Sequence, residues 1–151
     1  MKVVDTNIYL ANIVCILEEN YKVVIPVSGN SMSPFLCGGR DFVMLEKPSH
    51  KERKRGQIVL YKRAGGQFVL HRIQKMTGSY FYAIGDGQTK VEGPLSLSQI
   101  CAQVCMIQRK GKWISGKDFW SCFFKIIWIR VIPLRRVMIK IWAVLSMYGK
   151  K

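Results

Sequence analysis

Four runs rich in β-branched and aromatic residues follow one another between residues 57 and 109. They cover residues 57–62, 68–76, 80–84 and 100–109. Gly65-Gly66 separates the first two runs, and Thr77-Gly78-Ser79 separates the second from the third. Strands that are joined by such tight turns pair antiparallel, because a parallel pair needs a long crossover connection. The sequence therefore predicts a mainly β protein built on a coiled antiparallel sheet.

Further elements are predicted on both sides of these runs. Residues 22–27 and 41–45 are short apolar runs that are typical of strands, and Trp113-Ile114 follows a turn and is expected to pair back. Apolar residues recur at helical spacing over residues 5–19, which predicts an N-terminal helix.

The segment over residues 117–151 differs in composition from residues 1–116, which form the predicted β domain. It is rich in Trp, Phe and Ile, yet it holds eight Lys and Arg residues against one acid, Asp118. Asp118 is a suitable helix cap, and Pro133 is expected to split the segment into two helices. Because cations interrupt it, the segment has no run of about 18 apolar residues that could cross a bilayer.

An amphipathic helix pair that lies on a membrane surface fits this composition. The whole chain carries a net charge of +15, which suits an anionic partner. We expect Trp120, Trp128 and Trp142 to anchor the pair and the cations of residues 117–151 to contact anionic lipid. Two alternatives stay open: the segment packs on the β domain, or it docks another protein.

No secretory signal peptide is visible, because the apolar stretch from Ile8 to Leu17 is too short to span a bilayer and lacks a basic leading region. Membrane association at the cytoplasmic face is the default expectation. The sequence has no helix-turn-helix signature, zinc-finger spacing or aromatic-studded RNA-binding strand, so we expect no nucleic-acid partner. Cys101 and Cys105 have no second pair or nearby His, and we expect no metal or other cofactor.

Two short segments suggest nucleophilic chemistry. The first places Ser31 in a glycine-led turn directly after an apolar strand, and the second places His71 inside the apolar run over residues 68–76. A serine hydroxyl is a poor nucleophile until a base removes its proton, and histidine suits that role near neutral pH. Taken singly, Ser31 is a typical turn residue and His71 is a typical core histidine.

A third segment offers acids that could orient such a histidine. Asp86 lies in the turn Gly85-Asp86-Gly87, and Glu92 follows it. A Ser–His pair needs a partner that fixes the tautomer of the imidazole and stabilises its cationic form. Either acid could serve, and the residues alone leave the choice open. Backbone N–H groups of the Ser31 turn could bind an oxyanion.

Together these segments resemble the signal peptidase I family and its relatives, the self-cleaving SOS-repressor-type peptidases. The resemblance runs from about residue 20 to about residue 110 and is carried by five motifs. They are Ser28-Gly29-Asn30-Ser31-Met32-Ser33-Pro34, Gly39-Arg40-Asp41, Arg55-Gly56-Gln57-Ile58-Val59, Leu70-His71-Arg72-Ile73 and Gly85-Asp86. Bacterial signal peptidases have a lysine in place of His71. A histidine there is similar to the archaeal, endoplasmic-reticulum and sporulation-type branch.

The resemblance implies roles for four of these residues. Ser31 stands at the position of the nucleophile, and His71 stands at that of the general base. Glu92 occupies the position of an acid that is usually Asp, and Asp86 is the alternative acid to orient the histidine.

For the oxyanion, the resemblance points to the backbone. Gly29 stands where many bacterial members have a serine whose hydroxyl binds the oxyanion. Ser28 and Met32 are the other candidates for oxyanion or substrate binding. Gln57 replaces an Asp that is often found after the Arg-Gly pair, and the family's usual N-terminal membrane anchor is missing.

The function implied by the resemblance is that of a serine endopeptidase. Its substrate would be a leader or signal-type peptide or a preprotein, bound as an added β-strand. Two other classes stay open: an inactive peptidase-like binding module, and a basic protein that binds nucleic acid or a membrane surface. On the peptidase hypothesis, we expect deletion of residues 117–151 to weaken vesicle binding while peptide cleavage continues.

Overall fold

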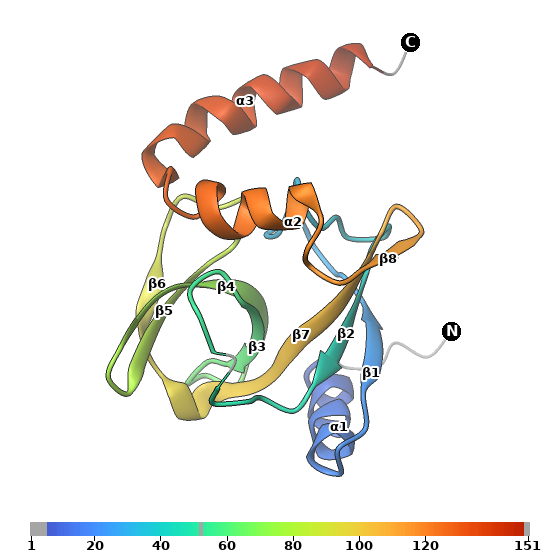
Figure 1. Ribbon diagram of the computed structural model, residues 1–151, viewed down its shortest axis with the longest axis vertical. Coiled ribbons are helices and arrows are strands. Elements are labelled where there is room, and N and C mark those ends of the chain that lie inside the picture. Colours follow the sequence, from blue (N-terminus) through green and yellow to red (C-terminus); the bar gives the residue numbers. More distant parts are fainter. Residues whose placement is uncertain (1–5, 52, 150–151) are drawn as a thin grey trace.

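The computed structural model describes residues 6–51 and 53–149 (Figure 1). Its elements, in chain order, are α1 (Thr6–Glu18), β1 (Val23–Pro26), β2 (Phe42–Glu46), β3 (Ile58–Lys62), β4 (Phe68–Thr77), β5 (Tyr80–Ile84), β6 (Glu92–Ser96), the 3-10 helix η1 (Leu97–Gln99), β7 (Ile100–Arg109), β8 (Lys112–Ile114), α2 (Phe119–Phe123), the π-helix η2 (Phe124–Trp128) and α3 (Ile132–Tyr148). α2 continues directly into η2.

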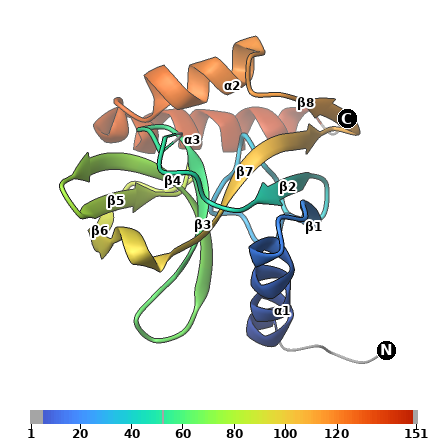
Figure 2. The ribbon, with the colours of Figure 1, turned by 60° about the horizontal axis from the view of Figure 1, so that its bottom comes forward.

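In the described ranges, the eight strands form one antiparallel sheet in the order β1-β2-β7-β3-β4-β5-β6, with β8 paired to β7. Register shifts interrupt the pairings β2–β7, β3–β7, β4–β5 and β5–β6. Such irregularities bend a strand and increase its twist. The sheet therefore curls without closing, as Figures 1 and 2 show. The predicted mainly β fold, with a helix at each end, is confirmed.

The predicted strands agree closely with the structure. Each begins and ends within one residue of its predicted bounds. Turn residues, many of them glycine, mark where one β-branched run ends and the next begins. Residue 5, where the predicted N-terminal helix begins, lies outside the described residues. β6 was not predicted, since its sequence Glu92-Gly93-Pro94-Leu95-Ser96 is typical of a turn.

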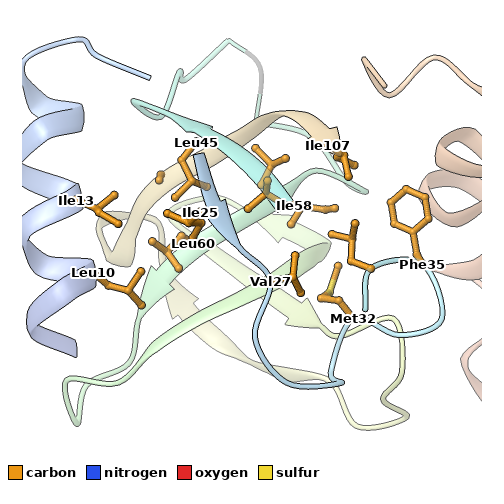
Figure 3. Close-up of a cluster of buried hydrophobic side chains, with 14 of the residues drawn as sticks. Leu10, Ile13, Ile25, Val27, Met32, Phe35, Leu45, Ile58, Leu60 and Ile107 are labelled. Atoms are coloured by element: carbon orange, nitrogen blue, oxygen red, sulfur yellow. The ribbon is translucent and has the colours of Figure 1, made fainter. Parts of the chain in front are cut away.

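β3 is buried on both faces and separates two hydrophobic clusters. Side chains alternate along a strand, so Leu60 faces the larger cluster and Tyr61 faces the smaller one. α1 covers the larger cluster. Figure 3 shows Leu10 and Ile13 of α1 pointing toward Ile25 and Leu60.

Two features of the sequence set the course of the C-terminal segment. The side chain of Asp118 accepts a hydrogen bond from the backbone N–H of Ser121 (3.2 Å) and caps α2, as predicted. Pro133 lies in the first turn of α3, where its missing N–H is tolerated, so the segment is split as predicted. Among the described residues, no helix has both the length and the hydropathy needed to cross a membrane.

Part of this segment belongs to the protein core. Phe124, Trp128 and Ile129 are buried, and the ring of Phe124 lies 4.9 Å from that of Phe35. The expectation that Trp128 anchors a membrane interface is wrong. Its indole is 3% exposed, and Nε1–H donates to the backbone oxygen of Asp86 (2.7 Å). A buried indole needs such an acceptor, and this one lies in the Gly85–Gly87 turn.

Candidate active site

Ser31 lies in the turn that connects β1 to β2. Gly29 opens the turn with φ of 72°, a left-handed conformation that glycine adopts without strain. Leu36 N–H donates to the oxygen of Met32 (3.0 Å), and the buried side chains of Met32, Phe35 and Leu36 fasten the turn to the core. Within the described residues, neither the hydroxyl nor the N–H of Ser31 makes a hydrogen bond.

The Gly85–Gly87 turn packs directly against the backbone of Ser31. Gly87 N–H donates to the oxygen of Ser31 (2.9 Å). A Cβ at Gly85 would collide with that same oxygen, and a Cβ at Gly87 would lie 2.7 Å from the oxygen of Ser33. Both positions therefore require glycine, and the Ser31 carbonyl is held by its hydrogen bond from Gly87.

His71 lies in β4 and is buried, with 3% of its surface exposed. It pairs with Val59 of β3, and Tyr61 lies two residues further along β3 on the same face. The Tyr61 hydroxyl is 3.3 Å from Nδ1 of His71. The β3–β4 register therefore brings the histidine and the tyrosine together.

Glu92 reaches His71 through Tyr61. The Tyr61 hydroxyl donates to Oε2 of Glu92 (2.7 Å), and Arg63 donates to both oxygens of the same carboxylate (2.7 and 2.9 Å). The hydrogen bond from Arg63 lowers the pKa of Glu92, so the carboxylate is the form present near neutral pH. Burial and the bond to Glu92 raise the pKa of Tyr61, which keeps its proton.

This chain of bonds determines the tautomer of His71. Tyr61 has one hydroxyl proton, and it uses that proton in the hydrogen bond to Glu92. Toward His71, the Tyr61 oxygen can therefore only accept a hydrogen bond. The imidazole proton is then on Nδ1, and Nε2 is the unprotonated nitrogen. Nε2 has no hydrogen-bond partner among residues 6–51 and 53–149.

Within the described residues, Asp86 makes no hydrogen bond to His71 and acts on it only through its charge. Its carboxylate accepts two hydrogen bonds from Arg72 (2.9 and 2.8 Å), and both side chains are almost fully buried. Arg72 also donates to the oxygen of Gly56 (2.8 Å). The structure thus brings Glu92 into the histidine network and gives Asp86 a role in holding β4 to the turn after β5.

Two residues of the C-terminal segment hold the same turn from outside. Trp128 donates to the oxygen of Asp86, and the fully buried Arg135 donates to the oxygens of Gly85 and Gln88 (both 3.0 Å). Arg135 also donates to the oxygen of Trp128 (2.9 and 3.1 Å). Burial lowers the pKa of Arg135 to about 10, so it stays charged at neutral pH.

Ser31 and His71 line one cavity of about 560 Å³. Ser28 and Met32 line it as well, whereas Gly29 is not one of its lining residues. No hydrogen bond joins the Ser31 hydroxyl to His71 in the described part of the chain. Catalytic hydrogen bonds are often long without substrate and tighten when it binds.

Burial is the main influence on the acidity of His71. It lowers the pKa of the imidazole to about 4, an effect that the charge of Glu92 and, more weakly, that of Asp86 oppose and that of Arg63 reinforces. The neutral imidazole is therefore the form present from weakly acidic to alkaline pH. A neutral histidine with a free Nε2 is able to accept a proton.

Sequence reasoning missed Tyr61, Arg63, Arg72 and Arg135. The expected hairpin at Gly65-Gly66 carries a signal for Tyr61, because its register places Tyr61 and His71 on one face of the sheet. No local pattern marks Arg135, because its acceptors Gly85 and Gln88 lie about fifty residues earlier in the chain. In the described ranges, no group of three or more His, Cys, Asp or Glu side chains gathers that could hold a metal ion.

Comparison of this chain with models of known protein families, with curated proteins and with solved structures found no match.

Proposed function

We propose that the protein is a serine endopeptidase of the signal peptidase I type, with Ser31 as nucleophile and His71 as general base. One observation carries the proposal. A serine with an unbonded hydroxyl and a neutral histidine with an unbonded Nε2 line the same cavity. The sequence motifs predict the same two residues as nucleophile and base.

In the proposed reaction, the Ser31 oxygen attacks the carbonyl carbon of the scissile bond while Nε2 of His71 takes the hydroxyl proton. The C–N bond then breaks, and His71 returns that proton to the leaving amine. Water then attacks the acyl carbon while His71 takes its proton, and His71 gives that proton to the Ser31 oxygen as the ester bond breaks. While His71 carries the extra proton, Tyr61 and Glu92 support it, because the imidazolium donates from Nδ1 to the Tyr61 oxygen, whose own proton is bonded to the Glu92 carboxylate.

Backbone N–H groups are the proposed oxyanion donors. Those of Ser31 and Met32 make no hydrogen bond with any described residue, so both remain available. Oxyanion donors of this kind stabilise an acyl-transfer transition state by about 3–4 kcal/mol each. The side chain of Ser28, on the wall of the same cavity, is the alternative donor.

The proposed substrate is an extended peptide, such as a leader or signal-type segment. β1 pairs only with β2 in the described sheet, and β5 pairs with β4 only from Arg72 onward. Residues 25–27 and 68–71 both line the cavity. The backbone N–H and oxygen of Val27 are already bonded to Asp41 and Gly39, so the available edge is that of residues 68–71, which β5 does not pair in the described sheet. A peptide beside this edge of β4 would bind as an added strand, with apolar side chains against Leu60 and Leu70.

A panel of leader-type peptides tests this proposal directly, with products identified by mass spectrometry across a pH range. Because acid protonates the base, cleavage must fall as pH falls through the pKa of His71. With that pKa lowered to about 4, we expect kcat/KM to be constant from about pH 6 to 8 and to drop below about pH 5. An inflection near pH 6.5, as for an exposed histidine, would contradict the buried base.

The role of Tyr61 and Glu92 is testable by two conservative substitutions. We expect Tyr61→Phe and Glu92→Gln each to lower kcat about 10-fold to 100-fold, since each removes a hydrogen bond that supports the charged imidazole, worth about 1.5–3 kcal/mol. KM should change little. Asp86→Asn is the matched control, and we expect it to lower thermal stability by weakening the buried pair with Arg72. A full loss of kcat in Asp86→Asn with normal activity in Glu92→Gln would reverse the assignment.

We also propose that the enzyme acts at a membrane surface, on the cytoplasmic face by default. The net charge of +15 and the exposed apolar side chains of the C-terminal segment support this proposal.

A further inference from the structure

The outer face of α3 is apolar although it is exposed. Five side chains recur every three or four residues and are 54–76% exposed: Leu134, Val137, Ile141, Leu145 and Tyr148. This spacing places them on one face of an α-helix. The exposed face of a helix on a globular protein is normally polar, so a contiguous apolar one indicates an interaction surface.

The opposite face of α3 is the one that holds the helix to the protein. Arg135 is fully buried and Ile139 is half-buried against the core. Beyond Ile139, every described residue of α3 is exposed. Figures 1 and 2 place α3 at the end of the molecule that is opposite to α1. Within the described chain, nothing covers the outer face.

Positive charge accompanies this apolar face. Arg136 and Lys140 are exposed and four residues apart, and Arg130 is exposed just before α3. Trp142, which is half exposed, adds an amphipathic ring of the kind found at lipid headgroups. Asp118 is the one acid in residues 117–151, and it caps α2.

We propose that the outer face of α3 binds an anionic lipid surface, with the helix lying in the plane of the interface. The inference rests on the proposed membrane association and names its contact surface and its lipid class. A second copy of the chain fits less well, because two such faces would bring like charges together with no acid to pair them. Nucleic acid would leave the row of apolar side chains without a partner.

The inner side of the same helix lies close to the candidate active site. A second cavity of about 340 Å³ lies between the Ser31 turn and α3, with Ser33 and Pro34 on one side and Met138, Ile139 and Trp142 on the other. A lipid-bound α3 would therefore hold the Ser31 turn near the bilayer. A peptide that emerges from the membrane would reach the cavity over a short distance.

Vesicle co-sedimentation of the full chain, without peptide, tests the lipid surface independently of cleavage. Phosphatidylcholine vesicles are used with and without about 30% phosphatidylserine, a content that gives a strongly negative surface. We expect binding to the anionic vesicles, weaker binding as salt is added, and little binding to the neutral ones. Failure to bind anionic vesicles would overturn both the membrane association and this surface.

Matched substitutions identify the contact face. We expect Ile141→Ser with Leu145→Ser to weaken anionic-vesicle binding at least about tenfold, and Lys140→Glu to weaken it at least about fivefold. The controls are Ile8→Ser with Ile16→Ser on α1, and Lys75→Glu on β4, all of them at exposed positions. We expect the controls to bind as the unmodified chain does, and circular dichroism to be unchanged throughout.

Three outcomes would overturn the α3 surface specifically. Vesicle binding that survives the α3 substitutions would leave membrane association standing through another surface. Equal losses of vesicle binding in Lys140→Glu and Lys75→Glu would indicate nonspecific electrostatic attraction to the lipid. A lipid-free dimer that disappears with Ile141→Ser and Leu145→Ser would identify a second copy as the occupant.

Discussion

Replacing Ser31 or His71 by alanine is expected to abolish peptide cleavage while the fold is retained. Loss of the nucleophile or the base in such a pair lowers kcat by about a thousandfold or more. Ser31→Ala leaves no buried group unpaired, since its hydroxyl makes no hydrogen bond with the described residues. In His71→Ala, Tyr61 keeps its bond to Glu92. Turnover of a leader peptide measures the loss of activity, and the urea midpoint of unfolding shows whether the fold is retained.

The chain provides a close control for each substitution. Ser33 lies in the same turn as Ser31, and His50, the other histidine of the chain, is exposed. We expect Ser33→Ala and His50→Ala to retain cleavage. Normal turnover by Ser31→Ala or His71→Ala would refute the mechanism. Peptide binding without turnover by the unmodified chain would favour the inactive binding module.

Truncation after Gly116 is expected to unfold the protein, contrary to what the sequence suggested. It removes Phe124, Trp128 and Ile129, and burial of such a side chain contributes about 1.5–3 kcal/mol. The combined loss is comparable to the stability of a typical domain, about 5–15 kcal/mol. It also removes the donors that hold the oxygens of Gly85 and Asp86. We expect an insoluble protein or one with no cooperative thermal transition.

Truncation after Ile139 is the matched control. It keeps Trp128 and Arg135 and removes, from the described chain, only exposed residues of α3 and Gly149. We expect its Tm to stay within a few degrees of that of the full chain, because surface changes away from caps and core contacts alter stability by only about 0.5 kcal/mol. A soluble, cooperative protein ending at Gly116 would show that residues 117–151 are an appendage after all.

The sequence predicted strands well where glycine turns and β-branched runs coincide, and it failed at β6. Glu92-Gly93-Pro94 contains two residues that weaken a strand. A strand tolerates them at an edge, where one side of its backbone needs no partner, and β6 is the last strand of the sheet. Whether a strand lies at an edge depends on the order of the whole sheet, which the local sequence does not state.

The candidate site was also predictable only in part, because some of its contacts depend on how the strands pair. The motifs pointed to Ser31 and His71, and the structure places both on one cavity. The choice between Glu92 and Asp86 depended on Tyr61 and Arg72, whose contacts follow from strand register. The expectation that Arg135 contacts lipid with the other cations of residues 117–151 is wrong, because its side chain is fully buried against the Gly85–Gly87 turn. A buried arginine and an exposed one cannot be told apart in a basic segment.

The bonds from Trp128 and Arg135 to the Gly85–Gly87 turn also set an order in time. Ribosomes add residues from the N-terminus, and domains fold as their chain emerges. The Ser31 turn and the strand that carries His71 are made first, whereas Trp128 and Arg135 are made some forty to fifty residues after the turn that they hold. A nascent chain that has not reached residue 135 therefore lacks the contacts that complete the site. The candidate site is therefore completed only after the sheet has been synthesised, because the residues that hold its turn come later in the sequence.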